Sequence, residues 1–220
     1  MDSKSVNKEI RKHIWPVLKE NGFSEFSTRS SWRYKGNRIN VVNFQSFNSY
    51  SADISKCTTF SFIINLGIYL SYIPDYPEMK KKHDKLAPDE AACHLRRTLE
   101  KNLLQKEMPR KNIWYVDPSG LNLNEVIENG LKVILEKGFP WFDEFNDNEA
   151  VIKVLKQGIE SEGGTFGFGN NPSPKRFLLL GFTASELGDA ETAKNAFEYV
   201  IKSDCYEYLN HVMQSKINSL

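Results

Sequence analysis

The residues best suited to chemistry lie close together around position 94. Cys93 and His94 are neighbours, and the carboxylates of Asp89 and Glu90 come just before them. A cysteine and a histidine act as nucleophile and base only when their side chains can form a hydrogen bond. Neighbouring residues point to opposite faces of a strand and diverge by roughly 100° around a helix. The sequence therefore argues against a Cys93–His94 dyad in either structure.

His94 can instead act together with Arg96, two positions further along the chain. In a strand both side chains lie on one face, where they could bind a carboxylate or a phosphate together. The alternative is a structural histidine that is paired across the sheet. The sequence leaves both interpretations open.

Amide side chains extend this candidate site. Asn43 and Gln45 share one side of an expected strand, and Asn65 can lie opposite them on a neighbouring strand. The alternative is hydrogen bonding between strands on a half-exposed sheet, because the register of the strands cannot be derived from the sequence. The predicted ligand-binding residues are His94, Arg96, Asn43, Gln45 and Asn65.

Other segments that could bind phosphate or metal have simpler structural explanations. The basic run 80–85, with Arg110 and Lys111, lacks the aromatic platform that single-stranded nucleic-acid sites use. The glycine-rich segment 162–169 lacks the Lys-Ser/Thr pair of a phosphate-binding loop and is expected to be a linker. The acidic cluster 143–149 lies at an expected helix start, where acidic side chains are favourable. We therefore expect no metal site and no cofactor.

The composition indicates a globular protein. The chain has 220 residues with 40% apolar content, which can supply a sizeable core. A net charge of +1, from 29 basic and 28 acidic residues, gives no overall field that favours nucleic acid or anionic membranes. No apolar run reaches the roughly 18 residues of a membrane span, and the polar start of the chain suggests a cytoplasmic protein. Cys57, Cys93 and Cys205 have no CxxC spacing, so reduced thiols are expected.

The first half of the chain predicts a helix followed by strands. Apolar residues recur at helical spacing from Val6 to Leu18, where Pro16 should kink the helix or end it early. From residue 31 the period changes to two, and a turn at Gly36-Asn37 predicts a hairpin that continues to residue 45. Thr58–Tyr69, after a loop rich in Ser and Asn, is typical of a buried central strand.

The middle of the chain is harder to interpret. Residues 73–88 contain several prolines and predict a long surface loop. Cys93–Leu99 can be a strand or the first turns of a helix, and the strand is favoured because 113–116 is a plausible antiparallel partner. Helices are expected at about 122–137 and 147–158. Capping pairs are expected for these two helices at Asn122 with Glu125 and at Asn146 with Glu149, and Gly138 and Pro140 should end the first.

Near the C-terminus, large and small packing residues have the spacing of a tetratricopeptide hairpin. They are Phe177, Leu180, Gly181, Ala184, Gly188, Ala190, Ala193 and Phe197. Segment 175–204 resembles a single tetratricopeptide repeat, with Phe177 at the position of the usual tryptophan. Because one repeat cannot bury its own apolar face, we expect support from the preceding helices and from a capping helix at 206–217.

These elements predict an α+β fold: an N-terminal helix on an antiparallel sheet of four to five strands, followed by an all-helical C-terminal part. We expect an α+β domain at 1–160 and a helical hairpin with its capping helix at 173–220, packed on the first part. The boundary should lie at 160–172.

Short phrases in the first two thirds of the chain are similar to a family of bacterial proteins catalogued only as domain of unknown function 4304. They are LKENGF at 18–23, VNFQ at 42–45, INLGI at 64–68, CHLR at 93–96 and FPWF at 139–142. The resemblance covers about residues 6–145. It departs from the family at Trp114-Tyr115, often a tryptophan pair there, and at Arg97-Thr98, where small residues are usual. The resemblance implies a fold and no particular activity.

The leading functional hypothesis is a non-enzymatic module that binds a protein or peptide, of an immunity-like or accessory type. The alternative is a small-ligand receptor or enzyme that uses a polar sheet-face pocket around His94 and Arg96. A nucleic-acid binder that uses the basic loop is the third class, and it would require affinity that falls steeply with salt.

Overall fold

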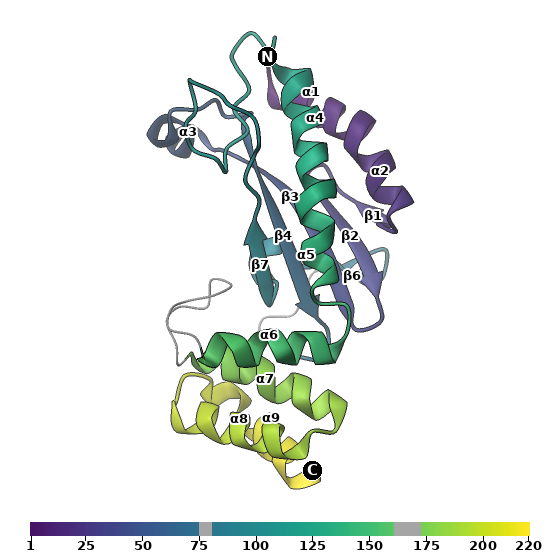
Figure 1. Cartoon of the computed structure of the whole chain (residues 1–220), viewed down its shortest axis with the longest axis vertical. Coiled ribbons are helices and arrows are strands. Elements are labelled where there is room, and N and C mark those ends of the chain that lie inside the picture. The colour runs from purple at the N-terminus through teal and green to yellow at the C-terminus, as the bar shows by residue number, and fades with distance from the viewer. Residues whose placement is uncertain (75–80, 161–172) are drawn as a thin grey trace. The chain divides into compact units, whose positions relative to one another are not determined.

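The computed structural model describes residues 1–74, 81–160 and 173–220 (Figure 1). The chain forms two compact units: unit 1 is Met1–Tyr69 with Met79–Trp141, and unit 2 is Leu70–Glu78 with Phe142–Leu220. The expected domain boundary and the glycine-rich segment 162–169 fall on or next to residues outside the described part. The division into 1–160 and 173–220 therefore stays a prediction.

Unit 1 is built on an antiparallel sheet, which has five strands within the described residues, in the order β1-β2-β3-β4-β7 (Figure 1). The strands are β1 Glu25–Phe26, β2 Ser30–Lys35, β3 Arg38–Ser46, β4 Phe62–Leu70 and β7 Leu95–Thr98. The predicted hairpin is confirmed, since Ser30 pairs with Asn43 and Lys35 with Arg38 around a turn in which Gly36 has a φ of 53°. The strand favoured at 93–99 is also confirmed. The predicted α+β class is thus correct.

Helices from both ends of unit 1 cover one face of this sheet. They are α1 Ser3–Glu9, the π-helical η1 Ile10–Ile14, α2 Trp15–Glu20, α4 Leu123–Val133, the π-helical η3 Ile134–Gly138 and α5 Phe139–Asp143. Trp15 packs edge-on against Phe44 of β3, with ring centroids 5.6 Å apart. Gly130 of α4 lies over Ile64 of β4, where an added Cβ would be 3.3 Å from the Ile64 Cδ1 atom.

Both π-helical segments of unit 1 come directly before an aromatic residue and a proline. The Trp15 amide donates to the Ile10 carbonyl, and the Phe139 amide donates to the Ile134 carbonyl, five residues back in each case. A proline lacks an amide and its ring clashes with the carbonyl four residues earlier in an α-helix. The wider turn before Pro16 and Pro140 accommodates this ring. The expected end of the helix 122–137 at Gly138 and Pro140 is therefore wrong, because the chain stays helical to the end of α5.

The opposite face of the sheet is covered in part by segment 81–94. Residues 73–88, expected as a surface loop, include the short hairpin of β5 Lys81–Lys82 and β6 Lys85–Leu86, and η2 Glu90–Ala92 follows. The turn forms because His83 and Asp84 adopt left-handed φ angles of 47° and 63°. The Tyr34 hydroxyl donates to the Leu86 carbonyl at 2.8 Å, and the Trp32 indole donates to the Pro88 carbonyl at 2.9 Å.

The basic run contributes to this packing. The Lys82 ammonium donates to the Phe26 carbonyl and lies 5.9 Å from the Trp32 ring centroid. The Lys85 ammonium lies 5.2 Å from the Tyr34 ring centroid. Contacts of this kind between a cation and an aromatic face are attractive. These two lysines therefore help to hold the hairpin on the sheet.

Two other segments differ from expectation. The loop rich in Ser and Asn contains α3, Ser49–Ser55, because the Asn48 side chain accepts a hydrogen bond from the Ser51 amide and caps the helix. Segment 113–116 does not pair with β7: Trp114 forms an isolated bridge with Phe62 of β4. The Trp114 ring stacks on Phe62 and its indole donates to Asn129 of α4, which fixes it there.

The helix caps also differ. Asn122 does not cap α4, because its side chain accepts from the Asp117 amide and donates to the Tyr115 carbonyl. Asp147 instead of Asn146 caps the next helix, since its carboxylate accepts from the Ala150 amide at 2.7 Å. Asn and Asp are both good N-cap residues. The spacing to a following glutamate therefore did not identify the residue that caps each helix.

Unit 2 contains helices packed on one another. They are α6 Asn148–Glu160, α7 Pro174–Leu187, α8 Ala190–Lys202, the short η4 Glu207–Leu209 and α9 Asn210–Ser219. α7 and α8 form the predicted helical hairpin, in which Gly188 ends α7 with a φ of 74°. Gly181 lets the helices approach, since an added Cβ there would lie 2.6 Å from the Phe197 ring. Among the described residues, none of the helices has the length and apolar character that crossing a bilayer requires.

Candidate functional site

The predicted amide residues meet on the sheet face opposite α1 and α4. The Asn65 amide nitrogen donates to Gln45 Oε1 at 2.9 Å, and Asn65 Oδ1 accepts from the Thr98 hydroxyl at 2.8 Å. Asn65 is buried, and both ends of its amide are used. We call Gln45, Asn65, Thr98, Arg96 and Glu90 the paired strip. Its two amide members, Gln45 and Asn65, lie on one surface and bind one another.

Arg96 belongs to the same face, because it pairs with Gly67, two residues after Asn65 on β4. Its guanidinium binds Glu90 with both arms, Nε to Oε1 at 2.6 Å and Nη2 to Oε2 at 3.2 Å. The hydrogen bonds to Glu90 raise the pKa of Arg96. A small anion at this place would have to displace the Glu90 carboxylate.

Gly67 leaves the space for this ion pair. An added Cβ would lie 2.5 Å from Cys93 Sγ, 2.8 Å from Cys93 Cβ and 3.5 Å from Glu90 Cγ. No side chain larger than hydrogen fits there without movement of Cys93. The paired strip is therefore closely packed beside the apolar group formed by Trp32 and Tyr69.

His94 and Asn43 have structural neighbours as well. The His94 ring stacks on Tyr69 with centroids 4.9 Å apart, and the His94 amide donates to the Ile68 carbonyl. The Asn43 side chain donates to the Ser30 hydroxyl across the hairpin at 2.9 Å. The structure thus brings the predicted residues to one face, and each of them contacts a neighbour there.

Lys101 holds the loop after β7 together, a role that was not predicted from the sequence. Its side chain is buried, with 7% of its surface exposed. The ammonium donates to Gln105 Oε1 at 2.8 Å, to the Met108 carbonyl at 3.0 Å and to the Ile113 carbonyl at 2.7 Å. Burial lowers the pKa of Lys101 from its ordinary 10.5 to about 8. Nothing in the spacing of this loop signals the role, because the acceptors are mainly backbone carbonyls.

The most exposed large apolar side chains of the described residues lie at the end of unit 1 where α4 begins. They are Leu104 at 98%, Leu121 at 92%, Tyr50 at 76% and Ile54 at 61% exposure. We call these four residues the apical patch. Tyr50 and Ile54 lie on α3, next to the loop that carries Leu104, and Leu121 comes two residues before α4 (Figure 1).

Hydrogen bonds and hollows connect the parts of the apical patch. The Arg110 guanidinium donates to the Ser55 hydroxyl at 3.3 Å, which joins the loop after β7 to α3. Leu104 lines a hollow of about 370 Å³ together with Asp117, Asn122 and Glu125 at the start of α4. Hydrogen bonds from the Ser119 hydroxyl and from backbone amides lower the pKa of Asp117 to about 2, so its carboxylate holds this turn.

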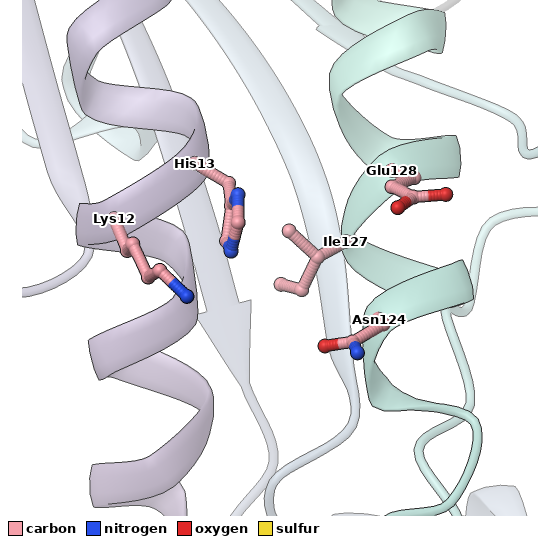
Figure 2. A pocket seen from close by; sticks show the side chains of 5 residues that line it. All are labelled: Lys12, His13, Asn124, Ile127 and Glu128. Atoms are coloured by element: carbon pink, nitrogen blue, oxygen red, sulfur yellow. The ribbon is translucent and has the colours of Figure 1, made fainter.

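A groove runs between the N-terminal helix and α4. Its deeper part is a hollow of about 140 Å³ lined by Lys12 and His13 of η1 and by Asn124, Ile127 and Glu128 of α4. Figure 2 shows the side chains of Lys12, His13, Asn124 and Ile127 directed into the space between the two helices.

A second hollow of the groove, of about 370 Å³, continues toward the start of α4. Lys12 and Asn124 line both hollows, and Lys8 and Leu121 line the second. The groove therefore borders the apical patch at Leu121. Within the described residues, neither Lys12 nor Asn124 has a hydrogen bond or ion pair from its side chain.

These features define a small α+β protein in which the side chains of the paired strip bind one another, whereas Lys12 and Asn124 in the groove have no such partner among the described residues. The chain belongs to the family described as Domain of unknown function (DUF4304), whose family model matches residues 6–144. No curated protein and no solved structure matches the chain. The family match supports the resemblance seen in the short sequence phrases.

Proposed function

We propose that this protein is a non-enzymatic module that binds a protein partner through the apical patch. The observation that carries the proposal is that the four most exposed large apolar side chains of the described residues occupy one end of unit 1. Exposed apolar side chains that gather in one region mark interaction surfaces more often than isolated ones do. Large apolar anchors also supply much of the binding energy at protein interfaces.

The loop that carries Leu104 has a defined structure. Lys101 ties it to Gln105, Met108 and Ile113, and the Lys101 amide donates to the Lys111 carbonyl at 2.8 Å. A loop held in this way loses little conformational entropy when a partner binds, which favours affinity. Leu104 is thus presented on a prepared surface.

Two finer features belong to the same proposal. The α7–α8 hairpin resembles a single tetratricopeptide unit, and this would give the helical unit a second surface for a partner. Because the resemblance of the chain is to bacterial proteins, the partner would be a protein of a bacterial cytoplasm, as for an immunity-like or accessory protein.

The test uses the full chain and a matched control. The double variant Leu104→Ser, Leu121→Ser removes half of the apical patch, whereas Leu135→Ser changes an exposed leucine, 41% exposed, on η3. Partners captured from the native host by the unchanged protein would be identified, and their affinities for all three chains measured with purified proteins. We expect about tenfold or weaker binding for the double variant only, the effect of losing one or two interface anchors. Equal affinity of the double variant, or the lack of a stoichiometric partner, would contradict the proposal.

A further inference from the structure

The N-terminal helix presents a row of lysines. Lys4, Lys8 and Lys12 follow one another at intervals of four residues, and all are exposed. In the part of the chain that the structure describes, none of them forms an ion pair. Like charges at this spacing slightly destabilise a helix. The row therefore works against the helix that carries it, and its contribution must be sought elsewhere.

The row leads into the groove between η1 and α4. Lys8 and Lys12 line its larger hollow, and Lys12 also lines the smaller one. Across the smaller hollow, the Asn124 amide points toward the same space, and Ile127 closes its floor (Figure 2). An ammonium group and an amide that converge on a hollow can donate several hydrogen bonds to one carboxylate.

Carboxylates line both hollows, Glu9 the larger and Glu128 the smaller, but neither forms an ion pair with Lys8 or Lys12 among the described residues. The Glu9 carboxylate binds His13 Nε2 at 3.1 Å. Asp2 accepts from the Ser5 amide and hydroxyl at 2.8 Å. The carboxylate of Glu128, which lines the smaller hollow, is directed away from Lys12 (Figure 2). The ammonium groups of Lys8 and Lys12 are thus left for an outside anion.

An apolar side chain beside the groove indicates which kind of ligand supplies that anionic group. Leu121, which is 92% exposed, lines the larger hollow together with Lys8 and Lys12. A free inorganic anion would make no use of an apolar side chain there. An acidic side chain in a protein segment with an apolar neighbour would contact both.

We infer that the groove binds an acidic segment of the partner, in which a glutamate or aspartate carboxylate lies between Lys12 and Asn124 and an apolar side chain rests on Leu121. The inference rests on the proposed function and adds the chemistry of the partner to it. Charge complementarity with the lysine row selects acidic segments and excludes basic ones.

The experiment uses two synthetic peptides, acetyl-Gly-Leu-Glu-Leu-Gly-amide and the same peptide with glutamine in place of glutamate. Each is titrated into the full ¹⁵N-labelled chain and followed by NMR. We expect the glutamate peptide to shift the signals of the Asn124 side-chain amide and of the backbone at Lys12 and Leu121. The glutamine peptide should bind about threefold to fivefold more weakly, the effect of an exposed ion pair. Lys12→Gln should remove this difference, whereas Lys153→Gln, an exposed lysine on α6, should keep it.

The outcomes separate this inference from the proposed function. Equal binding of both peptides, or an unchanged preference in Lys12→Gln, would overturn it. Sodium acetate that shifts the same signals with the affinity of the glutamate peptide would also overturn it, because Leu121 would then add nothing. Leu104→Ser should not affect the peptide preference. If the preference fails while the partner still requires Leu104 and Leu121, only the acidic segment is wrong.

Discussion

In the paired strip, Asn65 uses both ends of its amide, whereas Asn124 in the groove has no side-chain partner within the described residues. The same contrast separates two cations of unit 1. Arg96 is held by both oxygens of Glu90, whereas Lys12 forms no ion pair among the described residues. The two regions therefore contain similar chemical groups, which have hydrogen-bond and ion-pair partners in the paired strip and, among the described residues, lack them in the groove.

The difference follows from burial at two members of the strip, Asn65 and Glu90. A polar group that is buried without a hydrogen bond is costly, so these two side chains require matched partners. In the groove, water can satisfy Lys12 and Asn124 until a ligand replaces it. Matched polar groups thus stabilise a fold, and unmatched ones that converge on a hollow are available for binding.

Gly67→Ala should have the largest effect on the free energy of unfolding. It tests whether the paired strip is closed to a ligand. The new methyl would lie 2.5 Å from Cys93 Sγ and 2.8 Å from Cys93 Cβ, and overpacking of this kind costs about 3 kcal/mol. Tryptophan fluorescence during urea unfolding measures the loss, since Trp15, Trp32, Trp114 and Trp141 all belong to unit 1.

Gly138→Ala is the matched control for this substitution. Its added methyl would have ordinary contacts of 3.6 Å, and alanine favours a helical position. We expect no loss of stability. A Gly67→Ala chain as stable as the control would show that the strip has room for a ligand.

Lys101→Met should have the next largest effect, and it contrasts a buried lysine with the exposed Lys12. Methionine leaves the acceptors at Gln105, Met108 and Ile113 without their donor, which should cost about 2 kcal/mol. The variant should also loosen the loop that presents Leu104. Urea unfolding and hydrogen exchange of residues 101–113 would measure both changes.

The pH dependence gives Lys101 a separate signature. The unfolded chain holds the proton up to a pKa of 10.5, and the folded chain releases it near 8. Between these values the unfolded state binds more protons, so stability should rise with pH. Below pH 8 this group adds no slope. The rise should appear as the difference between the original chain and Lys101→Met, and a flat difference would contradict the burial of a charged group here.

Asn65→Ala should have a moderate effect. It removes two hydrogen bonds from a buried amide and leaves Gln45 and Thr98 with fewer partners, at a cost of about 1 to 2 kcal/mol. Gln45→Ala, at an exposed position, should cost less than half of that. The same fluorescence measurement applies. Equal small losses for both variants would mean that the strip contributes little to the fold.

The sequence could predict the parts of this fold that depend on short-range patterns. The hairpin around Gly36-Asn37 follows from a change to period two, and the alternation along β3 placed Asn43 and Gln45 on one side. The shared face of His94 and Arg96 followed from the same rule. The strand at β7 was favoured for a reason that proved wrong, because its expected partner 113–116 contacts β4 instead. Local periodicity therefore predicted much of the sheet and placed most of the candidate residues on one surface.

The parts that depend on distant partners could not be predicted. No local pattern indicates that Lys101 meets the carbonyls of Met108 and Ile113, or that Glu90 reaches Arg96 across a turn. The groove depends on which residues of α4 face η1, and this packing is set by two helices that are more than 100 residues apart in the chain. The sequence contains the spacing of Lys4, Lys8 and Lys12, but only the structure shows that Lys8 and Lys12 line a hollow.

Lys12→Gln should have the smallest effect on stability, and it tests the other side of the comparison. Since the substitution removes a like-charge contact with Lys8, the free energy of unfolding should change by less than about 0.5 kcal/mol, toward greater stability. High salt should remove this gain because it screens exposed charges. Fluorescence-detected unfolding at low and high ionic strength measures both. A loss above about 1 kcal/mol would show that Lys12 stabilises the fold as Arg96 does, and the groove could then no longer be distinguished from the paired strip.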